Sequence, residues 1–77
     1  MPTVFVKDGF RFFFYSNDHT PIHVHVRCGD GEAVFKMEGS VVLRESVGLK
    51  TKELAKAEDL ATEHMELIIL KWHEYFD

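Results

Sequence analysis

Three of the five histidines lie close together, at His19, His23 and His25. Successive side chains of a β-strand point to opposite faces, so His23 and His25 are predicted to share one face, with Cα atoms about 6.5–7 Å apart. Pro21 stiffens the loop that carries His19. Imidazole titrates near neutral pH and binds transition metals, so this segment could serve acid–base chemistry or a metal site.

One hypothesis is a small metal-independent endoribonuclease in which His23 and His25 act as acid and base. If the preceding strand forms a simple hairpin with the histidine strand, Arg11 and Tyr15 lie on the same sheet face. Arg11 and Arg27 would then contact phosphate and stabilise developing negative charge, and Tyr15 would position the substrate.

A second hypothesis is a metal-binding protein in which His19, His23 and His25 ligate zinc or another transition metal. Glu32, Asp18 or water would have to supply the fourth ligand.

A third hypothesis is a recognition face, in which Phe13, Tyr15 and the arginines stack on RNA bases or contact a partner protein. The plainest alternative is that the two strand histidines are polar residues of an exposed sheet face with no chemical role.

The patterning around these residues predicts an α+β fold, with an antiparallel meander of three to four strands followed by one long C-terminal α-helix. Alternation of apolar and polar residues between turn residues places the strands at about 3–7, 10–15, 22–28 and 32–37. Between 39 and 48 the alternation blurs; residues 41–43 could form a short edge strand or an apolar part of a loop, and we expect the loop. Apolar residues spaced by three and four predict a helix over 51–76, which must bend or reach a second subunit because it would overhang the strands.

Length and composition narrow the class of protein. The 77 residues are expected to form one domain, 1–77, and a core this small favours a metal or a homodimeric or small-protein partner as added support. The lone Cys28 cannot form an intrachain disulfide and suits the cytoplasm. The net charge of -4 argues against broad affinity for nucleic acid. The N-terminal residues do not resemble a signal peptide, and no apolar stretch approaches the ~20 residues of a membrane span.

Several segments of the chain resemble the small bacterial family known as domain of unknown function 4160: residues 8–17, 19–26 and 29–33, and the closing helix. The family signature H-x-P-P-H-V-H-V corresponds to His19, Pro21, His23 and His25, with Ile22 in place of the second proline. The resemblance implies a cytoplasmic bacterial protein with a genetic context like that of toxin–antitoxin pairs. The leading interpretation is therefore a component of a toxin–antitoxin-like module that acts through protein association, and enzymatic activity stays an open question.

Overall fold

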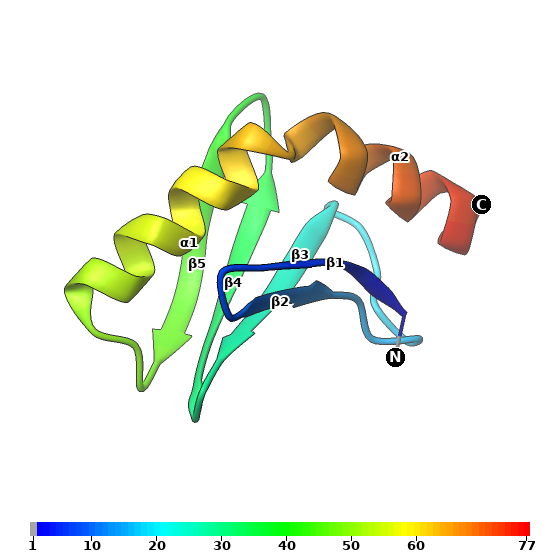
Figure 1. Cartoon of the computed structure of the whole chain (residues 1–77). Coiled ribbons are helices and arrows are strands. Elements are labelled where there is room, and N and C mark those ends of the chain that lie inside the picture. The colour runs from blue at the N-terminus through cyan, green and yellow to red at the C-terminus, as the bar shows by residue number, and fades with distance from the viewer. Residues whose placement is uncertain (1) are drawn as a thin grey trace.

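The computed structural model describes residues 2–77 as a five-stranded antiparallel sheet followed by two helices (Figure 1); residue 1 of the predicted domain lies outside the described residues. The strands are β1 (Thr3–Lys7), β2 (Phe10–Phe13), β3 (His23–Cys28), β4 (Gly31–Met37) and β5 (Val41–Val47), which are neighbours in that order. The helices are α1 (Thr51–Glu63) and α2 (Met65–Phe76). The α+β class and the meander are confirmed, but the sheet has five strands and not three to four.

The core lies between the helices and one face of the sheet. Alternation along β3 turns Val24 and Val26 into this core, where both are fully buried. The helices cover them with small and large apolar side chains: Ala57, Leu60, Ala61, Ile68 and Trp72. Because successive residues alternate, the same strand presents His25 and Arg27 on the face away from the helices. One strand thus serves both the core and the opposite face.

Turn chemistry sets the limits of β1, β2 and β3. Asp8 and Gly9 both have positive φ, at 52° and 82°, as the tight turn of a two-residue hairpin requires. β2 ends at Phe13, two residues earlier than predicted, and β3 begins at His23. The residues between these strands form the turn that carries Asp18.

The prediction of a loop between residues 39 and 48 is wrong, because β5 pairs with β4 along Val41–Val47. Arg44 has no partner in β4, since Phe35 pairs with Leu43 and Val34 with Glu45. β5 is an edge strand exposed over most of its length. A strand exposed on both faces does not need alternating polarity, which is why its sequence pattern is blurred.

The prediction of one long helix is also wrong, because the helix is interrupted at His64, which has φ -107° and ψ 20°. The His64 ring lies in the break, with Nδ1 2.9 Å from the Leu60 carbonyl oxygen and a stacked contact with Phe5 at 4.3 Å. The Leu60 carbonyl oxygen also accepts the backbone N–H of His64 at 3.0 Å, so the ring adds a second contact at this carbonyl without replacing the helical hydrogen bond. The break lets α1 contact β4 and β5 while α2 contacts β1. Among residues 2–77, no helix is long and apolar enough to cross a membrane.

The two helices offer a matched test of this packing. Leu60 is 2% exposed, whereas Leu70 is 54% exposed. We expect Leu60→Ala to lower the free energy of unfolding by about 2–5 kcal/mol, because it removes buried contacts and leaves a cavity. Leu70→Ala should change it by less than about 0.5 kcal/mol. Urea unfolding followed by circular dichroism measures both values, and equal losses would contradict the helix placement.

Candidate functional site

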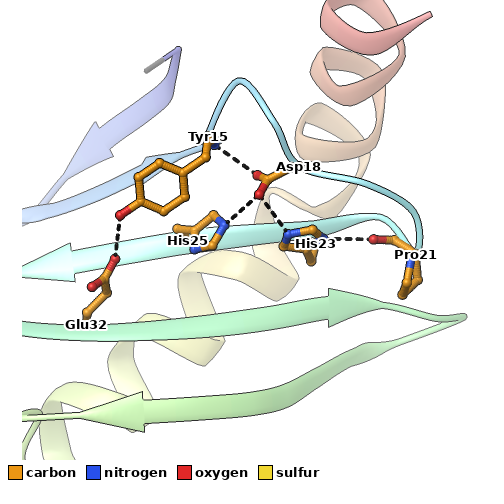
Figure 2. A network of polar contacts seen from close by, with 6 residues as sticks. All are labelled: Tyr15, Asp18, Pro21, His23, His25 and Glu32. Atoms are coloured by element: carbon orange, nitrogen blue, oxygen red, sulfur yellow. Dashed lines mark hydrogen bonds and ion pairs between the residues drawn. The ribbon is translucent and has the colours of Figure 1, made fainter.

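The turn between β2 and β3 fixes the carboxylate of Asp18 (Figure 2). Asp18 Oδ2 accepts a hydrogen bond from the backbone N–H of Tyr15 at 2.9 Å. The backbone N–H of Asp18 donates in return to the Tyr15 carbonyl oxygen at 3.1 Å. These two bonds hold one carboxylate oxygen against the turn and leave the other, Oδ1, free to face β3.

Asp18 Oδ1 contacts both histidines of β3. It lies 3.3 Å from Nε2 of His23 and 3.2 Å from Nε2 of His25. The three side chains are only 9%, 7% and 12% exposed in the order Asp18, His23, His25. Their ligand atoms all lie within 4.8 Å of one another, and within residues 2–77 this is the group whose geometry could hold a metal ion.

The backbone determines the tautomer of His23. Its Nδ1 lies 2.8 Å from the carbonyl oxygen of Pro21. A carbonyl oxygen can only accept, so Nδ1 carries the hydrogen and donates it. In the neutral ring, Nε2 then presents a lone pair toward the negative Oδ1 of Asp18. That approach is favourable only when a proton or a metal ion lies on Nε2.

Aromatic rings hold both imidazoles in place. His25 stacks on Phe13, with ring centroids 5.5 Å apart, and meets the edge of Tyr15 at 4.5 Å. His23 packs against Trp72 of α2 at 5.3 Å. The two histidines therefore have little freedom to reorient, and the site is largely pre-formed.

Tyr15 links this cluster to β4. Its hydroxyl donates a hydrogen bond to Glu32 Oε1 at 3.3 Å (Figure 2). Burial raises the pKa of the Tyr15 phenol above its usual value, and the charge of Glu32 and the hydrogen bond to it raise this pKa further. The phenol is thereby kept as a hydrogen-bond donor.

The two predicted arginines lie on the predicted face but away from the imidazoles. The strand register pairs Arg11 with Arg27. Arg11 Nε donates to Thr3 Oγ1 at 3.0 Å, and Arg27 Nη2 lies 3.6 Å from Glu32 Oε2 in an exposed ion pair. No hydrogen bond joins either guanidinium to a histidine within residues 2–77.

The structure brings together two of the three histidines proposed as metal ligands. His19 is exposed and lies outside the group that could hold a metal, whereas Asp18 belongs to it. Asp18 was predicted only as a candidate fourth ligand. Asp18 directly precedes His19 and lies in a turn. An aspartate in a turn commonly accepts hydrogen bonds from nearby backbone N–H groups, and this pattern is the sequence signal for its role.

A pocket of about 270 Å³ opens beside His25 on the same face of the sheet. Its lining comes from the turn, β3, β4 and β5: Tyr15, His25, Glu32, Ala33, Val34, Glu45 and Val47. The contribution of Glu45 and Val47 could not be predicted from the sequence, because residues 39–48 were expected to be a loop.

The family model described as Domain of unknown function (DUF4160) matches residues 9–73. The chain belongs to this family. The match spans Asp18, both clustered histidines and most of α2, so the whole candidate site lies within the DUF4160 region. No curated protein matches the chain, and no solved structure matches it either.

The raised pKa of Tyr15 gives a direct test of the network. Glu32→Gln removes the neighbouring negative charge, so we expect the pKa of Tyr15 to fall toward its ordinary value of about 10. Ultraviolet absorbance of the phenolate, measured with Tyr75→Phe in the background, reports Tyr15 alone. An unchanged or higher pKa would contradict the Tyr15–Glu32 contact.

The same shift has a consequence for stability. The pKa of Tyr15 is higher in the folded chain than in the unfolded chain, so the folded state favours the neutral phenol. This stabilisation is fully present below the unfolded pKa of about 10 and is lost as the pH rises through the folded pKa. Glu32→Gln should therefore flatten the fall of stability in that alkaline range.

Proposed function

We propose that this DUF4160 protein binds a divalent transition metal ion through Asp18 Oδ1 and the Nε2 atoms of His23 and His25. Zinc is the simplest occupant, because it accepts imidazole and carboxylate ligands and has no redox chemistry of its own. The observation that carries the proposal is the convergence of two imidazole nitrogens, His23 Nε2 and His25 Nε2, on one carboxylate oxygen, Asp18 Oδ1, in a buried site.

The distances from Asp18 Oδ1 to the two Nε2 atoms fit a shared metal ion as well as direct hydrogen bonds. Charge-assisted N–H···O contacts normally measure about 2.7–2.9 Å. Ligand atoms bound to zinc at about 2.0–2.1 Å in tetrahedral geometry lie about 3.3 Å apart. Asp18 Oδ1 lies at 3.3 Å from His23 Nε2 and 3.2 Å from His25 Nε2, which are the separations expected for two edges of such a tetrahedron.

The hydrogen bond from His23 to the Pro21 carbonyl is also typical of a metal-bound histidine. Such ligands commonly donate their second ring N–H to a carbonyl or carboxylate, which fixes the tautomer and the ring orientation. Three protein ligands leave a coordination position for water or another small ligand, as in catalytic rather than structural zinc sites.

The hypothesis of a metal-independent endoribonuclease has less support from this geometry. A substrate would have to reach His23, whose side chain is 7% exposed and lies between Asp18 and Trp72. The pocket beside His25 carries Glu32 and Glu45. Those carboxylates repel phosphate, and the arginines expected to bind it are paired elsewhere.

Metal binding is tested by titrating metal-free protein with Zn²⁺ in a calorimeter. We expect about one equivalent per chain, with release of protons because imidazole ligands must be deprotonated. Asp18→Asn and His25→Ala should each weaken binding at least about ten-fold. At free zinc about a hundred-fold above Kd, the metal should stabilise the fold by about 2.7 kcal/mol.

His19→Ala is the matched control, since it removes a neighbouring but exposed imidazole. It should leave the zinc affinity unchanged. If His19→Ala weakens binding as much as His25→Ala, the ligand set is the three histidines and not the Asp18 group. If wild-type protein binds no zinc, cobalt or nickel, the proposed function is wrong.

A second candidate function is protein association through β5, as expected for a component of a toxin–antitoxin-like module. The observation that favours it is the position of β5 at the edge of the sheet, with Val42, Leu43 and Val47 exposed along it. An exposed edge strand presents unpaired N–H and C=O groups that can pair with another chain. A second copy of this chain is the simplest partner for such pairing.

Association through β5 predicts a concentration-dependent dimer. Val42→Lys places a charge on the edge and should convert the dimer to a monomer, as measured by size-exclusion chromatography with light scattering. Leu70→Lys, a similar change at an exposed position of α2, should leave the dimer intact. A wild-type chain that stays monomeric at all concentrations would contradict self-pairing.

A further inference from the structure

We propose that the pocket beside His25 binds a small molecule carrying an alkylammonium group. The pocket shares His25 with the proposed metal centre, but neither Asp18 nor His23 lines it, so this inference goes beyond that proposal and does not depend on it.

Two neighbouring rows of side chains build the pocket across the sheet. In one row, His25 pairs with Val34, and Val34 pairs with Glu45. In the next row, Glu32 pairs with Val47. Directly paired residues point to the same face of a sheet, so these side chains surround a common space away from the helices.

The charge of this space is negative. Glu32 and Glu45 are its charged lining residues. Within residues 2–77, no ion pair or hydrogen bond engages the carboxylate of Glu45. Arg27 is 3.6 Å from Glu32, but its side chain is 55% exposed and it does not line the pocket. Because solvent screens the exposed Arg27–Glu32 pair, Arg27 neutralises the charge of Glu32 only weakly. The pocket therefore favours a cation.

The remaining lining suits a short alkyl chain. Val34 is 5% exposed and lies between His25 and Glu45 in their row, and Val47, which is 75% exposed, adds aliphatic surface at the rim. The volume of about 270 Å³ is below the range of about 300–1,000 Å³ typical of sites for drug-sized ligands. A small amine is therefore the appropriate class of ligand.

The register also orients the ligand. His25 and Glu45 stand two strands apart, which is about 9.5 Å at normal strand spacing. An ammonium group near Glu45 avoids repulsion from a metal ion held by His25. The alkyl end of the molecule then lies against Val34 and His25.

The test uses the full chain labelled with ¹⁵N, with and without zinc, titrated with n-butylammonium and, separately, with butyrate. We expect n-butylammonium to shift the backbone amide signals of Val34 and Glu45 in a saturable manner, and butyrate to leave them in place. Glu45→Gln should weaken n-butylammonium binding about three- to five-fold, because it removes one partly solvated charge contact. Glu58→Gln, a similar change on the exposed face of α1, should have no effect.

Two results would overturn the inference: butyrate binding as tightly as n-butylammonium, or no saturable shift at Val34 and Glu45 with either probe. The zinc titration separates this from a failure of the proposed function. If zinc binds and n-butylammonium does not, the metal centre stands and the pocket assignment is wrong. If n-butylammonium binds selectively and zinc does not, the pocket assignment stands and the metal centre is wrong.

Discussion

The shared oxygen of Asp18 is the constraint around which this structure is organised. A negative atom is held close to two imidazole nitrogens in a site with little access to water, and one of those nitrogens carries a lone pair in the neutral ring. Burying such an arrangement is unfavourable unless a positive charge compensates it. The turn after β2, the register of β3 and the packing of α2 on His23 all maintain this contact.

Because β3 contributes to both the core and the site, its two faces are coupled. Val24 and Val26 are fully buried beneath the helices, and the residues between and beside them carry the site. A shift of β3 by one residue would exchange the two sets, moving imidazoles into the core and valines into the pocket. The hydrophobic pattern that stabilises the fold therefore also positions the histidines.

Sequence reasoning succeeded where the alternation was strong and failed where a tertiary contact decided the outcome. The alternation at 22–28 correctly placed His23 and His25 on one face, and the hairpin correctly brought Phe13 beside His25. The choice between Asp18 and His19 depends on hydrogen bonds within a turn, which periodicity does not report. β5 was missed because an exposed edge lacks alternation, and the break at His64 was missed because it depends on contacts with Leu60 and Phe5.

All three residues of the cluster lie in one short stretch of chain, from Asp18 to His25. The loop closed when an ion joins them is short, so its closure entropy is small. An ion bound as proposed would therefore be able to associate early in folding and to close the turn between β2 and β3. In kinetic terms, the ion would accelerate folding by lowering the barrier to this hairpin, in addition to slowing the unfolding of the finished domain.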